Sequence, residues 1–215
     1  MERETIINKY TKYIIPYIIF LVGVLGHITE ETYSLITAIT PFTLFAMGMF
    51  VLYHILKENG RPVLYWIIAT YIVTFALEAI GVHTGLVFGE YTYGDILDPS
   101  FLGVPLIIGF NWVFVILGAA CIAQHYLSRP LLFALITALI TVVFDSFLEP
   151  VAIRLGYWTW ETTYVPLHNY AAWFAISFAA AYALKRIRIS FYTPVAIHYF
   201  IAQGLFFISL NVLLN

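Results

Sequence analysis

Seven long apolar segments follow one another along this chain of 215 residues, and they constrain its fold more than any other feature. A transmembrane α-helix needs about 20 predominantly apolar residues. The segments that reach or approach this length are 13–28, 33–56, 63–82, 104–126, 130–151, 169–185 and 192–213. Polar turns that contain proline separate several of them. The sequence therefore predicts an all-α integral membrane protein, with residues 1–215 forming a single domain of about seven transmembrane helices.

The composition excludes most other classes of protein. Hydrophobic residues make up 62% of the chain and charged residues 10%, and the mean hydropathy is +0.89. A soluble domain is nearer half apolar and a quarter charged, and a chain this short cannot hide the excess in one core. The net charge of -2 offers no basic surface for nucleic acid, and Cys121 alone cannot form an intramolecular disulfide. We therefore expect the lipid bilayer to be a partner and nucleic acid not to be one.

The basic residues predict how the helices are oriented. If the N-terminus is cytoplasmic, nine of the ten Lys and Arg residues fall on the cytoplasmic side, and Arg154 is the exception. This places the C-terminus outside and predicts a multi-pass protein of the plasma membrane. Three acids lie in the outer parts of the predicted spans, and the two long loops, 83–103 and 152–168, are on the same face. We therefore expect the functional site toward the outer half of the membrane.

An internal repeat relates the third and fourth spans to the fifth and sixth. Its units, 78–112 and 145–173, share the pattern acid, ten residues, Gly-x-aromatic-Thr-aromatic, a loop, Val-Pro-Leu, five residues and Trp. The matched residues are Glu78 and Asp145, Tyr91-Thr92-Tyr93 and Trp158-Thr159-Trp160, and Trp112 and Trp173. Packed about a pseudo-twofold axis, the two units would turn their acids and aromatic residues toward a shared cavity. The alternative for the aromatic residues alone is an interfacial belt.

The acids within the spans are the strongest candidates for chemistry. Asp145 and Glu149 are four residues apart, so they lie on one helix face. A charged acid in mid-span costs about 2.5–3.5 kcal/mol. Arg154 is an alternative partner for Glu149, whereas Asp145 and Glu78 have no evident basic partner. Desolvation and nearby like charge favour a protonated form, and a protonated acid in an apolar pocket is a general acid toward a hydrophobic substrate.

Several cofactor classes lack their residues in this sequence. No lysine lies in the seventh span for a retinal Schiff base, no histidine pair has di-iron spacing, and no dinucleotide or phosphate-loop motif occurs. Asp145-x-x-x-Glu149 as a magnesium site for a prenyl diphosphate is disfavoured, because Arg154 is the only basic residue predicted on the outer face. We therefore expect neither a cofactor nor a metal. At the depth of the acids, Asn111 and Asn169 are candidates for positioning water, with His83 nearby.

These residues resemble those of a known family. The first stretch runs from Glu78 to Gly85, through Phe88-Gly89-Glu90-Tyr91-Thr92-Tyr93 and Gly103-Val104-Pro105-Leu106, to Asn111-Trp112, and the second is Asp145-x-x-x-Glu149-Pro150 with Gly156-Tyr157-Trp158-Thr159-Trp160. Together they resemble the membrane carotenoid-biosynthesis proteins that hydrate acyclic carotenoid ends. These are the carotenoid 1,2-hydratases, including the bisanhydrobacterioruberin hydratases of archaea. The resemblance covers about residues 70 to 185.

The resemblance implies a hydro-lyase that adds water across the C1=C2 bond of an acyclic (ψ) carotenoid end. Its partners would be a hydrophobic carotenoid and other enzymes of carotenoid biosynthesis. Protonation at C2 gives a tertiary cation at C1, which water captures. From the physical properties of the residues, we expect Asp145 or Glu78 to be the acid and Glu149 the base or the holder of the water. The expected substrate-binding residues are Tyr91, Tyr93, Asn111, Trp112, Trp158, Trp160, Asn169, Trp173 and His83.

Two other functions remain open at this level. A carotenoid cyclase would begin with the same protonation, but an internal double bond would then attack the cation. A non-enzymatic membrane transporter or carotenoid-binding protein would use the acids as proton-coupling sites. The acids lie at one depth rather than in a relay across the bilayer, and this argues against the transporter.

Overall fold

A computed structural model describes residues 2–214, with side chains from Tyr10 onward, and this part of the chain contains seven α-helices. They are α1 (Glu2–Ile28), α2 (Glu30–Asn59), α3 (Pro62–Thr84), α4 (Leu106–Tyr126), α5 (Pro130–Arg154), α6 (Leu167–Arg186) and α7 (Pro194–Leu213). Between α3 and α4 lie β1 (Tyr91–Tyr93), the 3₁₀ turn η1 (Asp95–Leu97), β2 (Ser100–Phe101) and β3 (Val104–Pro105). Strand β4 (Trp158–Trp160) lies between α5 and α6. The predicted all-α membrane architecture is confirmed.

Six of the described helices are long and apolar enough to cross a membrane, namely α1 from Tyr10, α2, α3, α4, α5 and α7. The remaining helix, α6, has 20 residues and corresponds to the sixth predicted span. It is less apolar because it begins with His168 and Asn169 near its first turn and ends with Lys185 and Arg186. Helix α6 packs along α5, so its polar first turn is held against a neighbouring helix.

Proline marks the start of most of the helices. Pro62, Pro130 and Pro194 are the first residues of α3, α5 and α7, where a missing backbone N–H leaves no hydrogen bond unmade. Helices α4 and α6 each begin directly after a proline in extended conformation, Pro105 and Pro166. The two Val-Pro-Leu segments of the repeat therefore end their loops in the same way.

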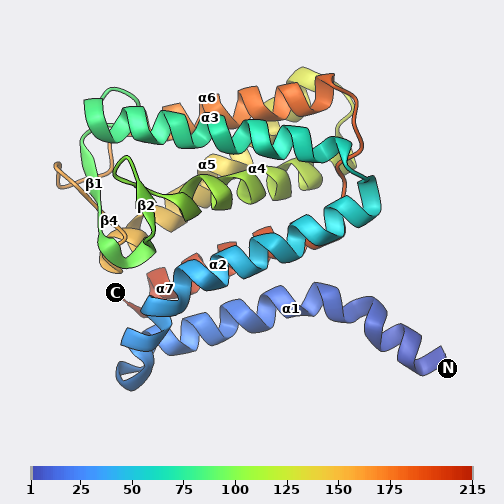
Figure 1. The fold of residues 1–215 in the computed structure, drawn as a ribbon, viewed down its shortest axis with the longest axis horizontal. Helices are drawn as coiled ribbons and strands as arrows, with labels where there is room; N and C mark the ends of the chain where they lie inside the picture. Colours follow the sequence, from blue (N-terminus) through green and yellow to red (C-terminus); the bar gives the residue numbers. More distant parts are fainter. Residues whose placement is uncertain (1, 215) are drawn as a thin grey trace.

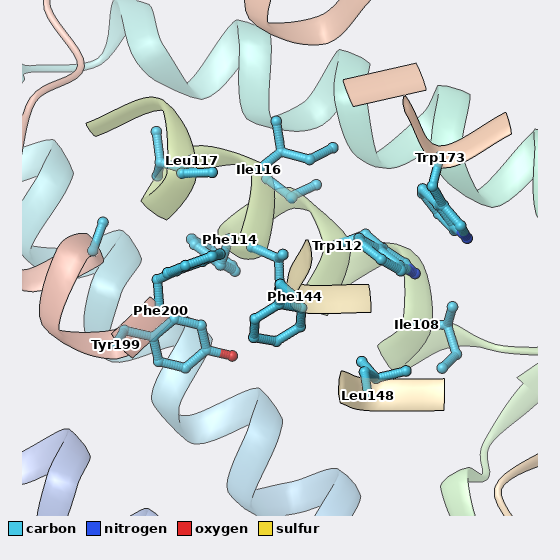
Figure 2. Close-up of a cluster of buried hydrophobic side chains, with 14 of the residues drawn as sticks. Ile108, Trp112, Phe114, Ile116, Leu117, Phe144, Leu148, Trp173, Tyr199 and Phe200 are labelled. Carbon is cyan, nitrogen blue, oxygen red and sulfur yellow. The ribbon is translucent and has the colours of Figure 1, made fainter. Parts of the chain in front are cut away.

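Helix α4 is the centre of the bundle. It contacts α2, α3, α5, α6 and α7, and its residues from Trp112 to Cys121 are all buried (Figure 1). Figure 2 shows its side chains packed among those of α5 and α7, with the labelled residues Trp112, Phe114, Ile116, Leu117, Phe144, Leu148, Tyr199 and Phe200. Helix α4 thus forms a rigid wall against which the site-bearing helices α3, α5 and α6 are placed.

The connections between helices alternate between the two ends of the bundle. Helices α2 and α3, α4 and α5, and α6 and α7 are joined at one end, whereas the two strand-bearing connections lie at the other end (Figure 1). There β1 pairs antiparallel with β4. The pairing is extended by the Gly94 N–H to the Tyr157 carbonyl at 2.9 Å and by the Glu161 N–H to the Glu90 carbonyl at 3.0 Å. Two loops far apart in the sequence therefore form one cover over the ends of the helices.

The close approach of α4 and α7 gives a test of this packing. A Cβ atom at Gly118 would lie 2.5 Å from Phe200 Cβ and 2.9 Å from the Ala196 carbonyl oxygen. We expect Gly118→Ala to lower the free energy of unfolding by roughly 1–3 kcal/mol, because the helices must separate to admit the methyl group. The measurement is the thermal midpoint of the detergent-solubilised protein. Gly204→Ala is the matched control, since its nearest neighbour would be 3.8 Å away, and equal midpoints for the two variants would contradict the packing.

Candidate active site

A small cavity lies beneath the paired loops, between the ends of α3, α4, α5 and α6. Its volume is about 20 Å³, enough for about one water molecule. Three carboxyl groups and a ring of aromatic side chains surround it. The lining residues are Glu78, Phe88, Tyr91, Tyr93, Ile108, Trp112, Asp145, Glu149, Trp158, Trp160, Asn169 and Trp173.

The two aromatic-Thr-aromatic segments of the repeat pair with each other across this cavity. Tyr91 lies opposite Trp160 and Tyr93 opposite Trp158, with Thr92 opposite Thr159 between them. Successive side chains of a strand point to opposite faces. All four rings therefore line the cavity, while both threonines are exposed. The symmetrical register, with each segment centred on its threonine, is what a local two-fold axis through this pair would produce.

The two tyrosines of β1 bind the carboxyl group of Glu78. The Tyr91 and Tyr93 hydroxyls both donate to Glu78 Oε2, the second at 2.8 Å. Burial raises the pKa of both tyrosines far above the ordinary value, and the neighbouring Glu78 raises it further. The phenols therefore keep their protons and remain donors to Glu78.

The two tryptophans of β4 bind Glu149 in the same manner. The Nε1–H groups of Trp158 and Trp160 donate to Glu149 Oε2 at 2.9 and 3.0 Å, and Asn169 Nδ2 donates to Glu149 Oε1 at 3.1 Å. Arg154, the alternative partner considered for Glu149, donates instead to the Asn211 carbonyl at 3.5 Å. These three N–H donors, rather than the guanidinium, satisfy Glu149.

Asp145 is the least satisfied of the three acids. Its side chain is fully buried, with 0% exposure. Asn169 Nδ2 donates to its Oδ2 at 3.3 Å, and its Oδ1 has no hydrogen-bond partner among the residues that the structure describes. One amide nitrogen thus bridges Asp145 and Glu149. A buried polar oxygen without a partner is uncommon and calls for a functional or structural explanation.

Stacked tryptophans form the apolar wall of the cavity. The rings of Trp112 and Trp173, which are equivalent positions of the repeat, stack with centroids 3.7 Å apart and an interplanar angle of 19°. Phe88 stacks on Trp173 with centroids 5.1 Å apart. Aromatic faces are electron-rich and attract cations. This wall therefore provides an environment that stabilises positive charge without supplying a nucleophile.

Ten of the twelve predicted site residues line this cavity, and two do not. Asn111 lies outside this lining: it precedes Trp112 on α4, so it points about 100° away around the helix. There its Oδ1 accepts from the Tyr199 hydroxyl at 2.7 Å and from Gln203 Nε2 at 3.0 Å. His83 lies outside the lining too, because five residues after Glu78 its side chain points to another side of α3, where it is exposed.

Two further residues line the cavity but were not expected there from the sequence, Phe88 and Ile108. Both carried a usable signal. Phe88 directly precedes the glycine of the repeated motif, and Ile108 stands one helical turn before Trp112, so it shares a helix face with an assigned residue. Among the side chains described, from Tyr10 to residue 214, no three His, Cys, Asp or Glu residues are arranged to hold a metal ion.

Comparisons with known proteins agree with these features. The family model described as "Carotenoid biosynthesis protein" matches residues 38–208. The chain belongs to this family. It is also similar to bisanhydrobacterioruberin hydratase from Haloarcula japonica, with 32% identity over 115 residues, which is 50% of this chain and 39% of the relative. The match thus spans well under half of the relative's length, and no solved structure matches the chain. The family resemblance read from the residues is confirmed.

The pairing of β1 with β4 can be tested by cross-linking. Residues directly opposite in an antiparallel pair have Cα atoms about 4.5–5.5 Å apart, within the range that a disulfide spans. We expect Thr92→Cys combined with Thr159→Cys to form an intramolecular disulfide on mild oxidation, because both positions are exposed and opposite. The measurement is the loss of two alkylatable thiols by mass spectrometry. Each single variant serves as a control, and a double variant that stays fully alkylatable would refute the register.

Proposed function

We propose that this protein is an enzyme that adds water across the terminal C1=C2 bond of an acyclic carotenoid end and yields a tertiary alcohol. The observation that carries the proposal is a buried cavity with room for about one water, three carboxyl groups and a wall of aromatic rings. The hydratase named among the similar proteins supports the choice of reaction. No cofactor is required, because the reaction needs one proton donor, one water and a surface that tolerates positive charge.

Hydrogen bonding favours Asp145 as the proton donor. Glu149 has N–H donors on both oxygens, and Glu78 Oε2 receives two phenols, so a proton on any of these oxygens would compete with a hydrogen bond already made. Asp145 Oδ1 carries none, so a proton there displaces nothing. Located in an apolar, aromatic site, that proton is available to an alkene carbon.

The remaining steps involve the aromatic rings of the cavity and its polar residues Glu149 and Asn169. Transfer of the Asp145 proton to C2 leaves a tertiary cation at C1, beside the aromatic rings that line the cavity. A water held by Glu149 and Asn169 then bonds to C1 through its oxygen and releases one proton to the Asp145 carboxylate. This restores the proton that Asp145 gave to C2, so one water is consumed and no proton is lost overall.

We further propose that the site lies in the outer half of the plasma membrane. The cavity is at the end of the bundle where the strands lie, opposite the end where α2 joins α3 and α4 joins α5. Lys57, Arg61 and Arg129 are in or beside those opposite connections. Basic residues concentrate on the cytoplasmic side, so the strand end faces outward.

Product mass tests the reaction directly. We expect that expression in a host that makes acyclic or monocyclic carotenoids gives a product heavier by one water, measured by liquid chromatography and mass spectrometry. A cyclase would give a product of unchanged mass and altered retention. Unchanged pigment in membranes that contain the full-length protein, with several acyclic ends tried, would refute an enzymatic role.

Substitution of the acids tests the assigned roles. We expect Asp145→Asn to reduce hydration by at least about 100-fold, the usual contribution of a general acid. Glu78→Gln and Glu149→Gln should also lose activity, because the amide replaces an acceptor oxygen with a donor beside phenol or indole donors. Asp95→Asn is the matched control, since Asp95 is an exposed acid at the same end. Membrane insertion should be unchanged throughout, and full activity of Asp145→Asn would remove Asp145 from the mechanism.

A further inference from the structure

A long apolar groove runs between α3 and α6 on the outside of the bundle. Its volume is about 450 Å³. Residues Ala69, Val73, Ala175 and Ala179 on its walls are exposed, so the groove opens outward toward the lipid. The remaining lining residues are Trp66, Thr70, Thr74, Leu77, Ile176, Ala180 and Ala183.

The groove is apolar although it contains threonine, tryptophan and backbone groups. The Thr74 hydroxyl donates back to its own helix, to the Thr70 carbonyl at 2.9 Å. At the far end, Trp66 Nε1 donates to the Ala180 carbonyl at 2.9 Å. The Thr74 hydroxyl and the Trp66 N–H therefore make their hydrogen bonds within the protein, and they need none from a molecule bound in the groove. What fits such a groove is a chain without polar groups.

The groove leads to the acid cavity. Both hollows are bordered by α3 and α6, which run in opposite directions. On α3, Thr74 of the groove stands one helical turn before Glu78 of the cavity, and on α6, Ile176 of the groove stands about one turn after Trp173 of the cavity, so each pair shares a helix face. From Trp66 to Leu77 the groove follows α3 for about 17 Å at 1.5 Å per residue. The cavity thus continues one end of the groove.

We propose that this groove holds the polyene chain of the carotenoid while its end is in the acid cavity. The proposal rests on the proposed function. A cavity of about 20 Å³ has no room for a polyene chain, so the chain must lie outside it, on one side. Strands β1 and β4 cover it above, and the buried α4 closes the side toward the core. The hollow between α3 and α6 is the side that continues toward the lipid.

A polyene suits this groove better than a lipid acyl chain does. The groove lies along two straight helices, so its occupant must be extended over its length. An acyl chain gives up many rotamers to become straight, whereas a conjugated chain is already stiff and loses little entropy on binding. An acyl chain also carries no end on which the carboxyl groups would act. The carotenoid is therefore the occupant expected during turnover.

Filling the groove tests the proposal. Ala179→Phe places a ring in the groove at an exposed position, where it strains no core packing. We expect the purified variant to retain about tenfold less carotenoid than the wild type, with loss of the induced circular dichroism of the bound polyene. Hydration should fall in parallel. Ala175→Phe, nearer the cavity, is a second variant with the same expected result.

Two controls separate this proposal from the proposed reaction. Ala46→Phe adds the same ring at an exposed position of α2, away from the groove, and should bind carotenoid like the wild type. Asp145→Asn should bind the polyene with an unchanged dichroic band but fail to hydrate it. Wild-type protein that binds the polyene without hydrating any acyclic end would refute the proposed reaction but not the proposed role of the groove in binding. Normal binding and hydration in both groove variants would refute the proposal that the groove holds the polyene. Membrane lipid would then be the occupant of the groove.

Discussion

Three carboxyl groups are buried at one end of this membrane bundle, and the surrounding structure must supply their hydrogen-bond partners. In an apolar environment each polar group must find its partners within the protein, since neither lipid nor bulk water can supply them. Glu78 and Glu149 receive theirs from β1 and β4 rather than from neighbouring helices. The two loops are therefore structural parts of the site. Their pairing delivers two tyrosines to one acid and two tryptophans to another at the same time.

The polar site lies at one end of the bundle, next to a largely apolar core. From Trp112 to Cys121 helix α4 is buried by mainly apolar contacts, and this stretch packs against the neighbouring helices. The polar contacts of the three acids lie at one end, between the helix ends and the paired strands. A substrate end can therefore approach the acids through apolar surroundings, and the water content of the site is restricted to a small cavity. Exclusion of bulk water strengthens every electrostatic interaction within it.

Helix number, helix ends and the acids could be predicted from the sequence because each has a local cause. Apolar length defines a span, proline defines its start, and an acid in a span is conspicuous at any position. The positions of Asn111 and His83 could not be predicted in this way. Depth in the membrane can be read from residue number, but the direction around a helix depends on which neighbours it packs against. Likewise, the groove between α3 and α6 depends on the spacing of two helices that are nearly 100 residues apart in the sequence.

The two units of the repeat differ in the acids that they carry and in the groups that bind those acids. By sequence offset Glu78 corresponds to Asp145, yet by contacts Glu78 corresponds to Glu149, one helical turn further along. The second unit thus keeps an acid bound by its aromatic segment and carries Asp145 in addition. The donors differ as well. A tyrosine hydroxyl both donates and accepts, whereas an indole N–H can only donate. Glu149 is consequently held by groups that cannot take its proton, and Glu78 by groups that can reorient. Asp145 is the acid that neither the two tyrosines nor the two tryptophans bind. Its Oδ1 makes no hydrogen bond to a described residue, so Asp145 can exchange a proton without breaking the hydrogen bonds of the site.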